Sequence, residues 1–248
     1  MTNKEGFIMK RILCMLMALM LALPATGCAE GLRSYNKQDG YVYVNLGRYP
    51  QKADGTVLPL LWRVLTADEE KAYLCSEYIL FAMPLHVNYT EYKTIGPDFG
   101  KTDLSHYLNG EFSDDAFTEE ERSLLMDFET YGKVFLMDSS ELKDREIGLG
   151  VGEPLKAWGT EYAIQVTGLF VYRPKYGSHS PYWTRNQSTT DARHARCTKD
   201  EGEVGHIISD RENEGVRPAC YLDLSLTEIV SGSGTMDDPF ILGKKAAE

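Results

Sequence analysis

The sequence predicts an α+β domain, built on a twisted antiparallel sheet that carries a few short helices and long loops. Strand-like alternation of apolar and polar residues dominates the chain after residue 40, whereas capping motifs typical of short helices gather in its middle. Near the end, two short apolar segments at 181–186 and 215–222 bracket a long polar stretch. Residues 41–243 have a length that fits one large domain, so we predict a single domain.

Residues 1–28 have the composition of a signal peptide. A Lys-Arg pair precedes residues 12–23, an apolar run that contains no charge. Such a run suits the core of a signal peptide, and it is too short to span a bilayer, which needs about 20 apolar residues. No later apolar segment reaches that length. We therefore expect the chain to be exported and the domain to be extracytoplasmic.

The apolar run leads to Cys28, which follows Ala-Thr-Gly. Small residues before a cysteine resemble the bacterial lipobox, in which the cysteine is lipidated and becomes the mature N-terminus. The alternative is ordinary secretion with cleavage near Ala29. We expect a cell-membrane lipoprotein of the bacterial surface or a secreted protein, with contact to the membrane only through a lipid anchor. Residues 29–40 are predicted to be a tether.

The formal net charge of −11 restricts the partners. An acidic surface repels the phosphates of nucleic acids and of anionic lipids, so neither is expected as the main ligand. A glycan or a surface protein is compatible with this charge.

Three cysteines remain after the leader, namely Cys75, Cys197 and Cys220. In an exported protein a Cys197–Cys220 bridge would close the polar stretch. Three buried free thiols are the alternative, because only the geometry of the folded chain decides whether two cysteines can pair.

The first part of the domain predicts a β-meander. Its alternating segments are 41–46, 58–66 and 72–80. Trp62 lies on the apolar face of the second segment, so we expect it to belong to the core. Residues 47–55 contain a proline and an Asp-Gly pair, which predict a turn. Residues 83–101 show no period and are predicted to be a long loop.

Short helices are predicted next. The spacing of apolar residues over 104–108 predicts a helix that stops at Asn109-Gly110. Thr118 and Glu121 form a capping box, and the apolar stripe at 124, 125 and 128 extends the helix that it starts. The same motif recurs at 138–141, after a short strand at 133–137, and Thr160 begins a last helix over 160–169.

A glycine-rich segment, Gly148-Leu-Gly-Val-Gly152, lies between these helices. It lacks the Gly-Lys-Ser/Thr sequence that completes a phosphate-binding loop, and no clear strand leads into it. We interpret it as a flexible loop.

The closing segment supplies the candidate binding surface. Residues 182–186 predict a strand that contains Trp183, and the polar stretch 187–214 is too hydrophilic for a core. Short strands at 193–197 and 204–208 would hold this stretch in space. The predicted ligand-binding residues are Trp183, Arg185, Asn186, Asp191 and Arg193. The alternative is a buried Trp183 with the polar stretch as solvated loop.

Two arginines in apolar strand segments need partners. Arg185 and Arg217 would each cost several kcal/mol if they were buried without a carboxylate or carbonyl partner. For Arg217 we expect a structural role rather than contact with a ligand. After it, residues 232–242 predict a turn and a last strand, and 244–248 a frayed tail.

Taken in order, these segments resemble domain-of-unknown-function family 6273, which occurs in bacterial surface proteins and lipoproteins. The matching segments are 46–51, 61–65, 104–109 with Phe112, 116–118 with Glu121, 134–136 with Glu141, 160–163, 182–185 and 215–219. The chain departs from the family at Tyr182, where the family has the first of two tryptophans, and at Asn186, where serine is common.

The resemblance implies a C-type-lectin-like fold, shared with sulfatase-modifying enzymes and retroelement-diversified receptors. In those proteins an aromatic strand, a variable loop and a Gly-x-Arg strand end the domain. The implied function is an extracytoplasmic binding module for a glycan, peptide or surface partner. The alternatives are an enzyme on the sulfatase-modifying fold and a structural module of a surface assembly.

The sequence offers little support for catalysis or for a cofactor. It contains no Gly-x-Ser-x-Gly, His-Glu-x-x-His or Cys-x-x-Cys motif, and its five histidines lack metal-ligand spacing. Asp237 and Asp238 suggest calcium, but acids before a proline are also ordinary turn residues. We therefore predict no catalytic residue, no metal ligand and no cofactor.

The lipobox interpretation predicts that Cys28→Ser releases the protein from the membrane fraction of its host. The substitution removes the thiol that would carry the lipid, so the protein should appear in the soluble fraction on an immunoblot. If the unsubstituted protein is already soluble in the medium, the anchor is absent.

Overall fold

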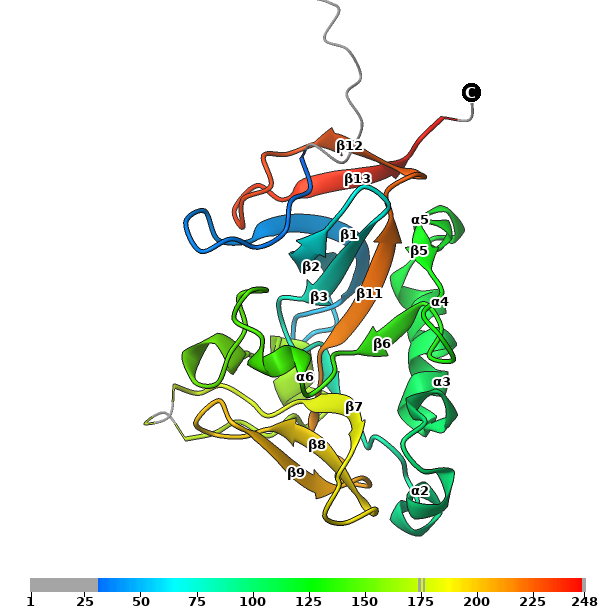
Figure 1. The fold of residues 1–248 in the computed structure, drawn as a ribbon, viewed down its shortest axis with the longest axis vertical. Helices are drawn as coiled ribbons and strands as arrows, with labels where there is room; N and C mark the ends of the chain where they lie inside the picture. Colours follow the sequence, from blue (N-terminus) through cyan, green and yellow to red (C-terminus); the bar gives the residue numbers. More distant parts are fainter. Residues whose placement is uncertain (1–30, 174, 176, 247–248) are drawn as a thin grey trace, which may run out of the picture.

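The computed structural model describes residues 31–173, 175 and 177–246. Within these residues one large sheet and two small ones carry short helices (Figure 1). The large sheet has the strand order β12-β13-β1-β2-β3-β11-β5, and β6 pairs with β11 off this path. Its strands are Val42–Pro50 (β1), Val57–Ala67 (β2), Lys71–Ser76 (β3), Leu125–Met126 (β5), Val134–Leu136 (β6), Pro218–Asp223 (β11), Thr227–Ser231 (β12) and Phe240–Lys244 (β13). The fold is therefore mixed, with far more sheet than helix.

The two small sheets hold the closing segment. β4 (Phe81–Ala82) pairs with β10 (Gly215–Val216). The other small sheet consists of β7 (Trp183–Gln187), β8 (His194–Thr198) and β9 (Val204–Ile208). It lies at the end of the molecule opposite β12 and β13 (Figure 1). The strands predicted inside the polar stretch are confirmed, and they make the stretch an ordered hairpin.

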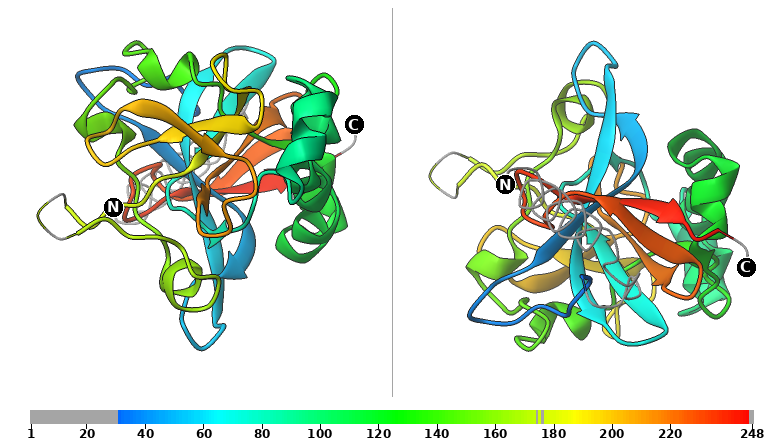
Figure 2. Two further views of the ribbon diagram at one scale, coloured as in Figure 1. Left: turned by 90° about the horizontal axis from the view of Figure 1, so that it is seen from below. Right: turned by 90° about the horizontal axis from the view of Figure 1, so that it is seen from above.

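The helices are all short. The α-helices are Tyr89–Ile95 (α2), Asp103–Asn109 (α3), Glu111–Ala116 (α4), Glu119–Ser123 (α5) and Glu161–Gln165 (α6). The 3-10 helices are Phe99–Lys101 (η2), Glu141–Lys143 (η3) and Glu153–Leu155 (η4). The helices α2 to α5 lie along one flank of the large sheet, as both end-on views show (Figure 2). No described helix is long and apolar enough to cross a membrane.

The predicted meander forms the centre of the large sheet. β1 pairs antiparallel with β2, and β2 with β3. Trp62 is fully buried in this centre, and its indole Nε1 donates a hydrogen bond to the carbonyl oxygen of Leu46 at 2.8 Å. The turn predicted at 47–55 is shorter than expected, because β1 continues to Pro50 past a bulge at Asn45/Arg48.

The predicted helix starts at Thr118 and Thr160 are confirmed, whereas the motif at 138–141 leads only to the 3-10 helix η3, which has no side-chain cap. In α5 the Thr118 side chain accepts from the Glu121 amide, and the Glu121 carboxylate accepts from the Thr118 amide. The same carboxylate also accepts from the Gly47 amide at 3.1 Å, which ties the helix to the bulge in β1. The predicted extension of this helix is wrong, because it ends at Ser123 and the apolar residues that follow form β5. Tertiary pairing with β11 overrides the helical spacing there.

Two predicted irregular segments are ordered. The long loop predicted at 83–101 contains α2, whose start is capped by the Asn88 side chain. Only Tyr92 of this helix is buried, so the sequence lacks the periodic apolar pattern that would predict a helix here. The predicted tail begins with Lys244, which belongs to β13, and the Lys245 amide donates to the Leu226 carbonyl at 2.8 Å.

The predicted tether packs against the large sheet in its described part. Leu32 is buried, and the Ser34 hydroxyl and the Tyr35 amide bond the backbone of β2. The predicted signal peptide and Cys28 lie outside the described residues.

Arg217 lies between β10 and β11 and is 1% exposed. Its Nε donates to the Ser76 carbonyl oxygen at 2.8 Å, and its Nη1 lies 3.4 Å from the Tyr182 hydroxyl. The guanidinium carbon also lies 5.3 Å from the centroid of the Tyr182 ring. The arginine therefore joins the end of β3 to the start of the β7 segment.

Arg217→Ala should lower the free energy of unfolding by about 3 kcal/mol, because it leaves a cavity and strips the buried Ser76 carbonyl of its partner. The melting temperature, followed by circular dichroism, should fall by about 6–12 °C for a chain of this size. Arg193→Ala, which removes an exposed arginine, is the matched control and should melt close to wild type. An unchanged melting curve for Arg217→Ala would refute its structural role.

Candidate functional site

The predicted ligand platform is part of the core. Trp183 is 1% exposed, and its Nε1 donates to the Met83 carbonyl oxygen at 2.9 Å. A ring enclosed in this way has no free face for a ligand. The structure agrees with the alternative, a buried tryptophan, and gives the predicted ligand role of Trp183 no support.

Arg185 pairs with the loop that follows β6. Its two terminal nitrogens lie 2.9 and 3.1 Å from the Glu141 carboxylate oxygens, and Nη1 also donates to the Leu136 carbonyl oxygen at 2.9 Å. The Asp138 carboxylate lies 3.7 Å away. The predicted pairing of this arginine with a carboxylate or carbonyl partner is confirmed. These contacts engage the guanidinium, so it is not free to bind a ligand.

Asn186 is engaged at both ends of its amide. Its Nδ2 donates to Asp138 Oδ2 at 2.6 Å, and its Oδ1 accepts from the Ser139 amide at 2.6 Å. Burial acts to raise the pKa of Asp138, but the hydrogen bonds from Asn186 and Ser140 outweigh it and hold this pKa below the usual value. Arg185 and Asn186 thus converge on Asp138 and fasten β7 to the large sheet.

Asp191 and Arg193 pair with each other at the turn between β7 and β8. Arg193 Nη2 lies 2.7 Å from Asp191 Oδ2, and both Nε and the backbone amide of Arg193 donate to Oδ1 at 3.0 Å. This closed ring of bonds shapes an exposed turn. The five predicted site residues therefore do not meet in one cavity.

The three described cysteines are free and buried. Burial raises the pKa of Cys75, Cys197 and Cys220, so each stays a thiol at neutral pH. The Cys197–Cys220 bridge is not formed, and its alternative, buried free thiols, is confirmed.

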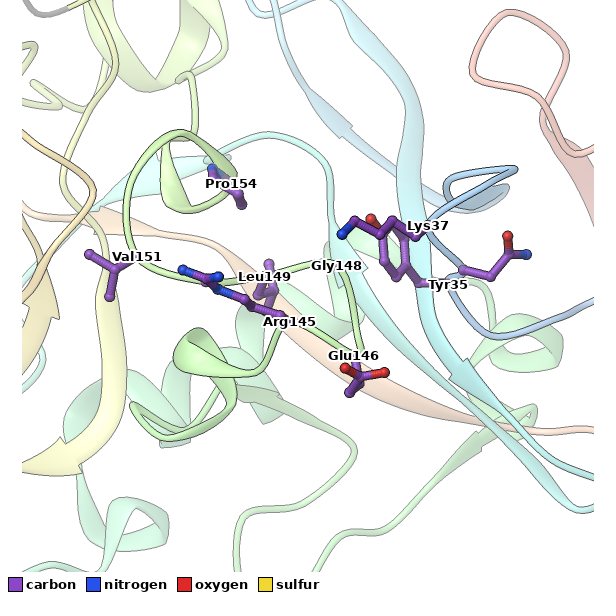
Figure 3. Close-up of a pocket in the computed structure, with 10 residues that line it drawn as sticks. Tyr35, Lys37, Arg145, Glu146, Gly148, Leu149, Val151 and Pro154 are labelled. Atoms are coloured by element: carbon purple, nitrogen blue, oxygen red, sulfur yellow. The ribbon is translucent and has the colours of Figure 1, made fainter.

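A cavity of about 510 Å³ opens elsewhere, between the segment before β1 and the glycine-rich loop. It is lined by Tyr35, Asn36, Lys37, Arg145, Glu146, Gly148, Leu149, Gly150, Val151 and Pro154. We call it the Tyr35 pocket. Tyr35 and Lys37 lie on one side of Gly148, and Arg145 lies on the other (Figure 3). Its volume falls within the range of small-molecule sites in proteins.

One wall of the Tyr35 pocket is fixed by backbone bonds and ring packing. The Tyr35 amide donates to the Leu65 carbonyl at 3.1 Å, and the Asn36 side chain caps the turn that follows. The Tyr35 ring packs on the Tyr41 ring with centroids 4.6 Å apart, and the Arg63 guanidinium covers Tyr41 at 4.8 Å. The wall is therefore held in place without a ligand.

The opposite wall requires glycine. Gly148 has a φ of +81°, and a β-carbon there would lie 2.3 Å from the Tyr41 hydroxyl. The amides of Gly148, Leu149 and Gly150 donate to the carbonyls of Arg145, Asp144 and Leu142. Because these amides are already paired, this loop does not form an anion nest, and recognition of a ligand depends on the side chains around it.

Charged side chains in the Tyr35 pocket lack partners. Lys37, Arg145 and Glu146 form no ion pair with any described residue, whereas Arg63, Arg122, Arg185 and Arg193 each pair with a carboxylate. The described residues hold no group of three or more histidine, cysteine or acidic side chains that suits a metal ion. The pocket therefore offers an aromatic ring and charges, but no metal centre.

Comparisons with known proteins add nothing to this geometry. No protein-family model, curated protein or solved structure matches the chain.

Sequence reasoning missed the Tyr35 pocket for a definite reason. Its two walls lie about a hundred residues apart along the chain, and only the folded sheet brings them together. One signal was present, because the glycine-rich segment 148–152 marks a place where the backbone must approach another group closely. The segment 35–37 carried no such signal.

Asn186→Ala should lower the free energy of unfolding at pH 7 by about 1–2 kcal/mol, since the Ser139 amide and the Asp138 carboxylate lose their partner. The measurement is urea denaturation. Asp191→Ala, at the exposed turn, is the control and should leave the urea midpoint close to wild type.

The effect of Asn186→Ala should shrink in acid. A carboxylate with a lowered pKa stabilises the fold above its unfolded pKa of about 3.9, and this contribution is lost as the pH falls through the lowered value. Denaturation at pH 3 should therefore separate the two proteins less than at pH 7. An equal difference at both values would exclude Asp138 as the partner that matters.

Proposed function

We propose that this chain is an extracytoplasmic, lipid-anchored binding domain that holds a glycan, peptide or surface partner in the Tyr35 pocket. The observation that carries the proposal is the pocket itself, a cavity of about 510 Å³ where an aromatic ring lies beside charged side chains without partners. An aromatic face next to polar groups suits a ligand with both apolar and hydrogen-bonding surface.

We also propose the C-type-lectin-like fold and membership of domain-of-unknown-function family 6273. Support comes from the end of the domain, where the aromatic strand β7, the β8–β9 hairpin and the Gly-Val-Arg segment follow in the order of that fold. The Gly215 amide donates to the Pro181 carbonyl at 3.0 Å, so the two ends of the polar stretch meet. A variable loop mounted on a closed base would have this geometry.

The enzyme alternative has weaker support. The sulfatase-modifying enzymes depend on paired active-site cysteines, whereas the described cysteines here are buried and free, with raised pKa values. A thiol that stays protonated is a poor nucleophile. A purely structural module leaves the unpaired charges of the pocket without a role.

Tyr35→Ala should weaken binding about tenfold, because the ligand loses its aromatic contact, and tenfold corresponds to about 1.4 kcal/mol. The ligand is first found on a glycan array and a peptide library, and its affinity is then measured by calorimetry. Tyr35→Phe keeps the ring and should bind nearly as wild type, and Tyr89→Ala, an exposed tyrosine on α2, is the control.

The proposal fails in either of two cases. A ligand whose affinity is the same for Tyr35→Ala and wild type lies outside the pocket. If no glycan or peptide binds the folded protein, the chain is not a binding domain for these classes.

A further inference from the structure

We infer that the Tyr35 pocket recognises a saccharide that carries a carboxylate, an inference that rests on the proposed binding function and narrows it. The juxtaposition behind it is a tyrosine ring flanked by an unpaired lysine and an unpaired arginine. Each of these groups matches one part of an acidic sugar.

Two cations line one cavity of an acidic protein. The chain has 37 acidic against 26 basic residues, and some of its cations, such as Arg63 and Arg185, pair with carboxylates. Lys37 and Arg145 have no ion pair among the described residues, although both line the same cavity. The Lys37 side chain extends toward Gly148, whereas Arg145 reaches along the loop toward Val151 (Figure 3). A ligand in the cavity would meet both positive charges.

The glutamate beside them does not neutralise the arginine. Glu146 forms no ion pair with a described residue, and its carboxylate points away from the Arg145 guanidinium (Figure 3). It lowers the net charge of the lining to +1, from one lysine, one arginine and one glutamate. A singly charged carboxylate therefore suits the pocket better than a doubly charged phosphate monoester does.

Side chains, rather than backbone amides, must recognise the carboxylate of the ligand. The amides of Gly148, Leu149, Gly150 and Gly152 all donate within the fold, so the loop presents no free row of donors to an anion. A guanidinium matches a carboxylate with two parallel hydrogen bonds, and a lysine ammonium adds a point charge. Arg145 is thus the specific contact and Lys37 the less directional one.

The remaining contact favours a sugar over an acidic peptide. Tyr35 is half-buried on the Tyr41 ring, and a free part of an aromatic surface suits the apolar face of a sugar ring. One common way for an extended peptide to bind is to add a strand to a sheet edge. The pocket is lined instead by a capped turn, a glycine loop and a 3-10 helix, which offer no strand edge.

The test compares acidic glycans with neutral ones on a glycan array. The acidic set carries uronic or sialic acids, and the neutral set contains the same glycans after reduction of the carboxyl groups. We expect the acidic form of the best ligand to bind at least tenfold more tightly in calorimetry. Its affinity should fall between 50 and 300 mM sodium chloride, because salt screens charge pairs.

Two variants assign the charge contacts. Arg145→Gln should weaken binding of the acidic glycan at least tenfold, Lys37→Gln should weaken it severalfold, and both should leave binding of the reduced glycan unchanged. Lys143→Gln removes an exposed lysine of η3 that does not line the cavity, and it should bind as wild type. Arg145→Lys should recover only part of the affinity, since it keeps the charge without the paired donors.

The outcomes separate this inference from the proposed function. Equal affinity for acidic and reduced glycans, with Tyr35→Ala still weakening both, overturns the charge recognition and leaves the binding domain intact. If acidic peptides bind in a way that depends on Arg145 and no acidic glycan binds, the inference that the ligand is a saccharide is overturned. If nothing binds to the folded protein, the proposed function itself fails.

Discussion

The buried guanidinium of Arg217 is the contact on which the joining of the sheets depends. A charge with almost no exposure is costly unless its donors find partners. The Arg217 Nε donates to the Ser76 carbonyl at the end of β3, and Nη1 contacts the Tyr182 hydroxyl just before β7, whereas the buried Nη2 has no partner among the described residues. The large sheet and the β7–β9 sheet therefore meet at a polar contact that tolerates little displacement. Tyr182 extends this contact, since its hydroxyl donates to the Leu155 carbonyl at 3.0 Å.

The polar contact of Arg217 with Ser76 and Tyr182 explains how a long polar stretch can be inserted without loosening the fold. The stretch leaves the core at Tyr182 and returns to it at Gly215, and these two residues form a β-bridge. Within it, Asp191 and Arg193 pair with each other, and Arg185 fastens β7 to its surroundings through Glu141. Charges used in this way stabilise the structure and leave little for a ligand. In the Tyr35 pocket, by contrast, three charged side chains without an ion pair to a described residue, Lys37, Arg145 and Glu146, line one cavity.

Local patterns in the sequence were enough for much of the fold. Alternation located the meander, and cap motifs located the starts of α5 and α6, because both signals depend on neighbouring residues. α2 was missed because it buries only one residue, and the helix after Thr118 was extended too far because pairing with β11 competes with helical spacing. The pocket depends on contacts between distant segments, such as Tyr35 with the Leu65 carbonyl and Gly148 over Tyr41. The glycines at 148–152 indicate a close backbone approach, but neither segment alone reveals which residues it contacts.

Ligands should occupy the Tyr35 pocket rather than the β7–β9 sheet. Solution NMR tests it most directly, with amide shifts of the 15N-labelled protein followed during titration of an acidic oligosaccharide. The largest shifts should fall at residues 35–37 and 145–151, while residues 183–196 stay nearly unchanged. Shifts concentrated at 183–196, with the pocket residues unmoved, would contradict it.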